Sequence, residues 1–395
     1  MAQKLSYVLI TPYSLMKSRA GGIIARLLSG TGLELAGAQV FAPTAEFAQA
    51  QASSIRRELW ESEPFGVKLF SDYIRENFIP LDDGTNARMM ILLFRGENVS
   101  RKLLQAVGEL LPSARTRQSA IIGETIRDIY GDLVFNRDGS VDYFEPAVII
   151  PFDDESALSK LEHIADFLEK APNIVENTAG RNEKKTERTI VLVRPRDWQN
   201  PTAMPGNISD MISRTGLRLV GCKIHGMNVK EALELYAPMK EKLRGLLAEE
   251  AAGEAEKVLN EHFGFSMGEG CRTVLRDVVG VPYADEQYKK IIQFMSGCHV
   301  DALPANWESL PRREKCLVLV FEGENAVSRI RDLLGSAEQF PCGREGENLM
   351  VGEVQYSQSE EDFRRASTIL RINENSVSEI IRAYLTGHRE SEQSE

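Results

Sequence analysis

The chain carries closely similar segments twice, and the two occurrences lie 184 residues apart. Residues 22–40 read GIIARLLSGTGLELAGAQV, and residues 206–224 read GNISDMISRTGLRLVGCKI. A second pair follows: residues 94–104 read FRGENVSRKLL, and residues 321–331 read FEGENAVSRIR. A solenoid repeats every ~20–50 residues, so this spacing is too long for one. It predicts two tandem copies of one domain.

Domain boundaries follow from the repeat. A chain of 395 residues has room for two or three ordinary domains, and the repeat selects two. We expect the first domain at 1–171 and the second at 189–385, joined by a polar linker at 172–188 that lacks an apolar period. The second copy has an extra segment at 246–279, which opens with an acidic helix. The polar stretch 386–395 predicts a disordered tail.

Each copy shows the same order of short apolar runs and amphipathic segments. Strands are expected in the first copy at 6–10, 33–41, 88–94 and 147–150, with helices between them and after the last. The order β-α-β-(α-α)-β-α-β-α favours an α+β fold of two tandem ferredoxin-like (βαββαβ) domains, with antiparallel sheets covered by helices. The GEN segments predict turns from strand to helix in which Asn or Glu caps the helix, although such a helix start can also attract a phosphate.

Composition excludes several classes of function. The net charge of −11 disfavours a nucleic-acid binder, which would carry a basic face. No stretch approaches the ~20 apolar residues of a membrane span, and the first residues lack a signal pattern. The five cysteines, none in a CxxC pair, are typical of structural thiols in a reducing compartment and argue against a zinc or other metal site. We therefore expect a cytoplasmic protein.

The ordered segments resemble the nucleoside diphosphate kinase family, in both copies. In the second copy the resemblance is carried by ALELYAPMKEKLR at 232–244, PYADEQYKKIIQFMSG at 282–297 and FEGENAVSRIRDLLG at 321–335. In the first it is carried by EPFGVKLFSDYI at 63–74, FRGENVSRKLL at 94–104 and TIR at 125–127. The resemblance implies the ferredoxin-like fold. It also implies a histidine that takes the γ-phosphate of one nucleotide and passes it to another, with Mg²⁺ and cations around the phosphates.

The histidine of that family is missing from both copies. In the first copy its position holds Pro151. In the second, alignment on Asn348 places it at Val351, and alignment on the following helix places it at Gln355. The resemblance therefore implies no catalytic residue here.

Several cationic positions of the family remain, mostly in the second copy. There the family's lysine is matched by Arg194, its tyrosine by Tyr236 and its arginines by Arg331 and Arg344, whereas the first copy keeps only Arg127. The first copy has Thr11 in place of the lysine. These five residues are the candidate nucleotide contacts.

The chain has five histidines of its own, none at the family's position: His163, His225, His262, His299 and His388. Each is more typical of an ordinary surface or half-buried histidine than of a phosphate acceptor.

Three functions stay open. The chain is a nucleotide-binding or scaffolding pseudoenzyme; or it is an active nucleoside diphosphate kinase with a displaced histidine; or it is an interaction module that binds no nucleotide and uses the segment 246–279 as a contact surface. We expect the two copies to pack as a pseudo-dimer, and a homo-oligomer stays open. The sequence favours the first function.

Overall fold

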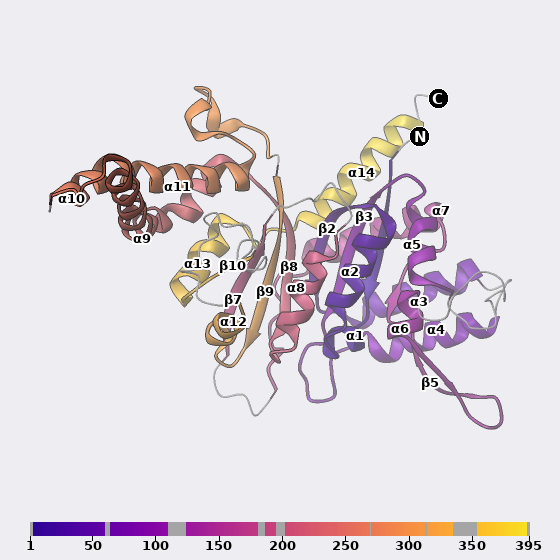
Figure 1. The fold of residues 1–395 in the computed structure, drawn as a ribbon. Helices are drawn as coiled ribbons and strands as arrows, with labels where there is room; N and C mark the ends of the chain where they lie inside the picture. The colour runs from indigo at the N-terminus through magenta and orange to yellow at the C-terminus, as the bar shows by residue number, and fades with distance from the viewer. Residues whose placement is uncertain are drawn as a thin grey trace.

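The computed structural model describes residues 3–59, 64–109, 124–180, 186–194, 202–268, 270–312, 314–334 and 354–392. It contains two four-stranded antiparallel sheets that stand side by side (Figure 1). The first has the order β2-β3-β1-β6, and the second has the order β10-β7-β9-β8. Read from the opposite edge, the second order is the first, which is the strand order of the ferredoxin-like fold. The predicted α+β class with two such sheets is confirmed.

The first sheet is formed by residues 4–149. Its strands are β1 (Lys4–Ile10), β2 (Glu34–Phe41), β3 (Met89–Gly96) and β6 (Val148–Ile149). Its helices are α1 (Pro12–Met16), α2 (Ala20–Thr31), α3 (Ala45–Leu59), α4 (Pro64–Asn77), α5 (Val99–Val107), α6 (Ile126–Tyr130) and α7 (Asp154–Lys170). A separate hairpin of β4 (Asp132–Phe135) and β5 (Val141–Glu145) projects from this half (Figure 1).

The second sheet repeats this plan with a longer helical insertion. Its strands are β7 (Glu187–Val193), β8 (Arg218–Met227), β9 (Glu314–Gly323) and β10 (Val354–Tyr356). Its helical elements are α8 (Met204–Ser213), α9 (Val229–Phe263), α10 (Cys271–Leu275), the π-helical turn Arg276–Gly280, α11 (Val281–Ser296), the 3₁₀ turns Val300–Ala302 and Trp307–Ser309, α12 (Ala326–Leu334) and α13 (Glu360–Ile369). A last helix, α14, spans Ser376–Glu392.

The strand register shows that the two sheets are equivalent residue by residue. The β2–β3 ladder has a bulge between Leu35 and Gly37, and the β8–β9 ladder has one between Leu219 and Gly221. These bulges fall at the same two positions of the repeated TGLxLxG segment. A bulge is a specific backbone irregularity, so its repetition shows that the two sheets share one strand arrangement down to this detail.

One hydrophobic core joins the two halves. It combines side chains from one face of both sheets with those of α2, α5, α8 and α12. Helices α2 and α8 cross at contact distance, because a β-carbon on Gly206 would lie 2.2 Å from the Ala25 nitrogen and one on Gly21 would lie 2.2 Å from the Asp210 nitrogen. Only glycine permits so close an approach of two helix backbones. The two halves thus pack against each other through α2 and α8.

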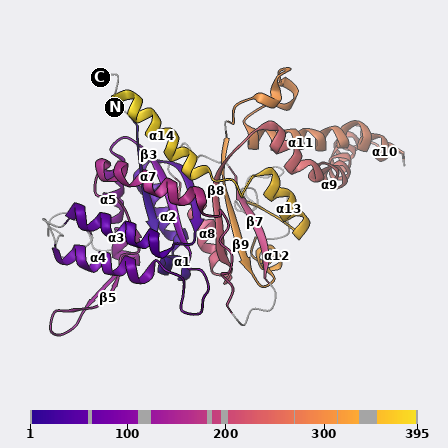
Figure 2. The ribbon, with the colours of Figure 1, turned by 180° about the vertical axis from the view of Figure 1, so that it is seen from behind.

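The other face of each sheet has its own core. Helices α3, α4 and α7 cover the first sheet together with α14. Helices α9, α11 and α13 cover the second. Figure 2 shows α14 lying against the first half, although it is the last element of the chain.

The helix α14 corrects two boundaries. It continues to Glu392, so most of the tail predicted as disordered at 386–395 is helical. It also buries Val377, Ile381 and Leu385 in the core of the first half rather than of the second. The sequence analysis missed this because an amphipathic helix does not reveal which surface it covers.

The predicted linker is docked along the seam between the halves. Ile174 forms a β-bridge with Gly221, and the Val175 nitrogen donates to the Val220 carbonyl at 2.8 Å. Further on, Thr178 donates to the buried Glu322 carboxylate at 2.8 Å, and that carboxylate also accepts from Arg188 at 2.8 Å. The described part of the segment 172–188 therefore behaves as an added strand fragment and not as a free tether.

The insertion is the outer part of a helical hairpin, which we call the arm (residues 246–283). The sequence suggested a new helix near Leu246, but α9 runs unbroken over 35 residues through Pro238. The arm projects away from both sheets (Figures 1 and 2). Its two sides approach closely at Gly280, where a β-carbon would lie 2.2 Å from the Ala248 carbonyl oxygen.

Candidate functional site

The strand register locates the position equivalent to Pro151. In the first half Leu9 pairs with Ile149, and in the second Leu192 pairs with Gln355. Four residues beyond Ile149 and Gln355 come the helix N-caps Asp153 and Ser359, each accepting the amide of the third residue after it. Pro151 is therefore equivalent to Ser357, two residues beyond Gln355.

This equivalence corrects the alignment drawn from the sequence. Gln355 is not the counterpart of Pro151, and Val351 lies outside the described residues. Neither Pro151 nor Ser357 is a histidine. Sequence alignment failed here because the chain between α5 and β6 is longer than the chain between α12 and β10.

The Ser357 hydroxyl is hydrogen-bonded to strand β7. Its hydroxyl oxygen accepts a hydrogen bond from the Ile190 nitrogen at 3.0 Å and lies 3.0 Å from the Thr189 hydroxyl. The residue is 6% exposed. A hydroxyl held in this way, without a neighbouring base among these contacts, is not activated as a nucleophile.

In the first half a buried carboxylate stands beside the position where the resemblance implies a lysine. Glu145 is 2% exposed and accepts hydrogen bonds from the Thr11 hydroxyl at 2.8 Å, the Tyr73 hydroxyl at 2.6 Å and the Ala147 nitrogen at 2.9 Å. Burial raises the pKa of Glu145, and the hydrogen bonds offset only part of that effect. The sequence analysis noted Thr11 but missed this network, because Glu145 lies 134 residues away.

Arg127 is bound to backbone carbonyls. Its guanidinium donates to the Gly108 carbonyl and, at 3.3 Å, to the Val148 carbonyl. It is 9% exposed, and burial lowers its pKa to about 10. These contacts tie the end of α5 to β6, so the candidate phosphate contact of the first half has a structural role.

In the second half the structure brings together two of the candidates. The Arg194 guanidinium lies 5.9 Å from the centre of the Tyr236 ring, within the range of a cation–π contact. Both residues are buried, and burial raises the pKa of Tyr236 to about 12 while Arg194 opposes that rise. Arg194 follows β7 directly, so it sits where the resemblance places the lysine.

The remaining candidates are not assembled with this pair by any described contact. Arg331 is exposed in the last turn of α12. Arg344 lies outside the described residues. Of the candidate cations, the described part of the second half therefore offers Arg194, which is buried beside a tyrosine, and Arg331, which is exposed on a helix.

The sequence analysis missed a buried histidine cluster next to β8. His225 is 1% exposed, and its Nε2 lies 3.1 Å from the Glu231 carboxylate, which also accepts from Arg312 at 2.6 Å. Burial lowers the pKa of His225, and Glu231 opposes that shift. Glu231 belongs to the capping box that starts α9 at Asn228. This motif was the one sequence signal that marked the site.

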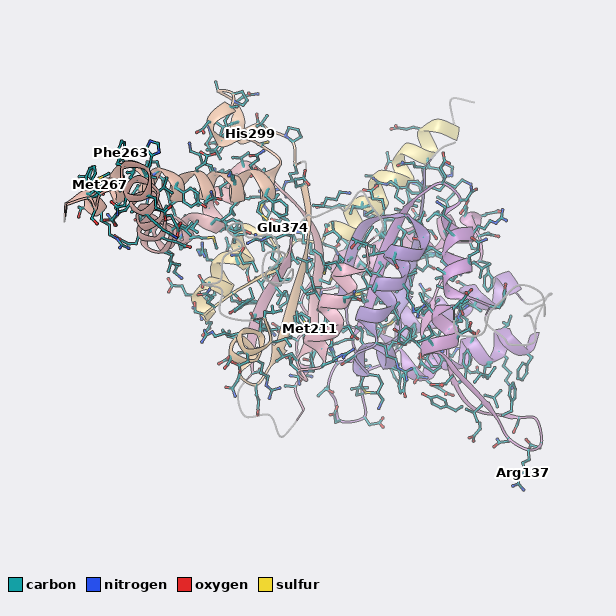
Figure 3. All side chains as sticks on the ribbon, viewed as in Figure 1. Arg137, Met211, Phe263, Met267, His299 and Glu374 are labelled. Atoms are coloured by element: carbon teal, nitrogen blue, oxygen red, sulfur yellow. The ribbon has the colours of Figure 1, made fainter. Side chains whose placement is uncertain are left out.

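His299 and His262 have local partners. His299 lies 2.8 Å from the Gln293 side chain, on the loop beyond α11 and at the opposite end of the second sheet from α12 (Figure 3). The His262 ring packs against Phe263 at the tip of the arm, which Figure 3 also labels. The described contacts of the two rings involve neither Arg331 nor Arg127.

Three further observations limit the chemistry of the described part of the chain. Its His, Cys, Asp and Glu side chains form no group of three that could hold a metal ion. Cys222, Cys271, Cys298 and Cys316 are free thiols. In the same residues, no helix combines the length and the apolar character needed to cross a bilayer.

Comparison with known proteins gives structural likeness only. No family model matches the sequence, and none of the curated proteins matches it. The solved structures that resemble it include nucleoside diphosphate kinases. That of Aquifex aeolicus is 18% identical, with a TM-score of 0.29, and the match covers 41% of this chain and 95% of that one.

Two further structures are similar to the same degree. The enzyme from Borrelia burgdorferi, solved with vanadate and ADP, is 12% identical with a TM-score of 0.30, over 40% of this chain and 83% of that one. The enzyme from Pyrobaculum aerophilum is 17% identical with a TM-score of 0.28, over 49% and 97%. At these identities and scores, the likeness carries no information on activity or ligand.

Proposed function

We propose that this chain is a nucleoside-diphosphate-kinase-like pseudoenzyme of the cytoplasm that lacks the phosphohistidine relay and binds nucleotide through its second half alone. The observation that carries the proposal is the pair of equivalent positions Pro151 and Ser357. A proline side chain has no nucleophilic atom, and the Ser357 hydroxyl accepts a hydrogen bond from the Ile190 nitrogen of strand β7. Covalent transfer of a phosphoryl group requires a nucleophile at the site.

The chemistry of the first half argues against phosphate binding there. Glu145 lies beside Thr11, and two like charges 4 Å apart repel by about 4 kcal/mol near a protein surface. Arg127, which could offset that repulsion, is already bonded to two carbonyls. A nucleotide phosphate would therefore meet a buried carboxylate without a free cation among these groups.

The second half has a more favourable balance of charge. Arg194 ends β7 beside Tyr236, and Arg331 is exposed on α12. The described residues provide no resident Mg²⁺ site, so Mg²⁺ would arrive on the nucleotide phosphates, as is common for this ion. There it would neutralise phosphate charge while Arg194 and Arg331 orient the phosphates.

Two assays test the proposal. Incubation with γ-labelled ATP should leave no acid-labile, base-stable phosphoprotein and should form no GTP from GDP. ATP with Mg²⁺ should raise the melting temperature, since a ligand at 100 times its Kd adds about 2.7 kcal/mol to the free energy of unfolding. Labelled protein, or GTP formed from GDP, would show that the relay or a direct transfer operates after all.

A pair of variants tests the site. Arg331→Ala should abolish the thermal shift. Arg364→Ala, on α13, removes another exposed arginine, whose partner is Glu360, and it should keep the shift. A shift of equal size in both variants, or none in the parent protein, would overturn the binding half of the proposal.

A further inference from the structure

A cavity of about 410 Å³ lies between α9 and α13, against strands β7 and β10. Sites for small organic ligands measure ~300–1,000 Å³, so this volume fits a ligand rather than a few waters. The wall against the sheet and the two helices is apolar, and it is formed by Ile190, Leu192, Leu235, Ala366 and Leu370. All five belong to the core of the second half. At the mouth, Leu246 is 49% exposed and extends this apolar surface outward.

A polar contact between the two helices, made by Asp362 and Arg365 of α13, forms part of the cavity lining. Pro238 in α9 has no N–H, so the Glu234 carbonyl lacks its helical partner. Arg365 of α13 donates to that carbonyl at 3.2 Å, to the Leu235 carbonyl at 2.9 Å and to Asp362 at 3.1 Å. The helices are thus joined through a long side chain rather than by close packing, which leaves the space next to it unfilled.

Two polar groups at the cavity lack a hydrogen-bond donor or an ion-pair partner among the described residues. Gln355 pairs with Leu192 in the ladder and so faces the same side of the sheet, and its side-chain oxygen is buried without a hydrogen-bond donor. A buried acceptor without a donor is costly, which favours a ligand that supplies one. Lys242 lines the mouth, is exposed, and forms an ion pair with no described acidic residue.

We propose that this cavity binds a small carboxylic acid with an apolar body, of the class of medium-chain fatty or hydroxy-fatty acids. The body would lie on Leu192, Leu235 and Leu370, and the carboxylate would meet Lys242 at the mouth. A hydroxyl on the body would donate to Gln355. Arg194, Tyr236 and Arg331 do not line the cavity, but Ser357, the position equivalent to Pro151, does. The proposal itself needs no nucleotide, and competition with ATP decides whether the two sites overlap.

Calorimetric titration of the full chain tests the proposal with three probes that share one tail: decanoate, decanol and decyltrimethylammonium. Decanoate should bind once per chain, decanol should bind less tightly, and the cation should bind least tightly of the three. Lys242→Gln should weaken decanoate about 2–5-fold, the range for one exposed charge pair, and should leave decanol unchanged. The matched control is Lys240→Gln, because Lys240 lies over the Tyr288 ring of α11 and does not line the cavity.

A graded series tests the apolar wall. Ala366→Val, Ala366→Leu and Ala366→Phe fill the cavity stepwise, so decanoate affinity should fall in that order while circular dichroism stays unchanged. The smaller substitutions keep the test valid if the phenylalanine variant does not fold.

The proposal is overturned by no binding of decanoate, by several decanoates per chain that the series does not affect, or by decanol binding as tightly as decanoate. Displacement of decanoate by ATP would also overturn it, because the cavity would then be the nucleotide site.

Discussion

Replacing Gly21 by alanine tests the crossing of α2 and α8, which holds the two halves together. A β-carbon there would lie 2.2 Å from the Asp210 nitrogen, although β-carbons essentially never approach another heavy atom within 3.0 Å. The obstacle is backbone, which cannot rotate away as a side chain can. The two helices must therefore move apart, and the core that they share must loosen.

The size of the effect follows from two opposing terms. Overpacking a closed interior costs about 1–3 kcal/mol, whereas alanine stabilises a helix relative to glycine by about 0.5–1 kcal/mol. We expect Gly21→Ala to lower the free energy of unfolding by about 1–2 kcal/mol. Gly30 is the matched control, because it lies in the same helix and an added β-carbon meets nothing within 4 Å. Gly30→Ala should show only the stabilisation of about 0.5–1 kcal/mol that alanine gives a helix relative to glycine.

Urea unfolding followed by circular dichroism compares the two variants with the parent protein. Gly206→Ala should reproduce the loss from the other helix, since its β-carbon would lie 2.2 Å from the Ala25 nitrogen. The double variant should lose less than the sum of the two losses, because one displacement of the helices relieves both contacts. The reasoning is refuted if Gly21→Ala is as stable as Gly30→Ala.

Three further predictions concern single side chains. Burial raises the pKa of Glu145 from 4.5, so the parent protein loses stability as this carboxyl ionises in the folded state. The stability of Glu145→Gln relative to the parent should therefore increase as pH rises from about 4.5. Urea unfolding of both proteins across pH checks this. Gly280→Ala should loosen the arm and speed amide exchange there, since its β-carbon would lie 2.2 Å from the Ala248 carbonyl oxygen. Arg365→Met should lower the melting temperature through loss of about 0.5–1.5 kcal/mol, and unchanged melting would mean that water replaces the guanidinium at the Glu234 carbonyl.

The repeat in the sequence was enough to predict the fold. Strands with a period of two and helices with an apolar face can be read locally, and duplication reduced two unknown halves to one. What the sequence could not give depends on contacts between distant residues. Thr11 gave no sign of Glu145, and nothing in α14 showed that Val377 and Ile381 would cover the first half.

The candidate site was predicted less well than the fold, for a physical reason. Arg127 and Arg331 have the same charge in the sequence, but the first is buried against carbonyls and the second is exposed. The role of an arginine depends on the partners it finds, which only the folded chain provides. The Arg194–Tyr236 pair was foreseeable because the resemblance named both residues.

The GEN segments show how a sequence motif can reflect backbone geometry. Asn98 and Asn325 both adopt a left-handed backbone with φ of 52°, and Asn98 makes no side-chain cap, contrary to the prediction. Gly96 and Gly323 are less constrained, since added β-carbons would lie 2.6 Å and 2.7 Å from the ends of the Leu33 and Leu217 side chains, which can move aside.

The two asparagines thus suit the left-handed backbone at the turn from strand to helix in their own halves. The fold gives a reason for these residues in both halves that does not involve a nucleotide. The resemblance carried by this motif is thus a statement about backbone geometry. The test of activity must therefore come from positions outside this motif, such as Pro151 and Ser357.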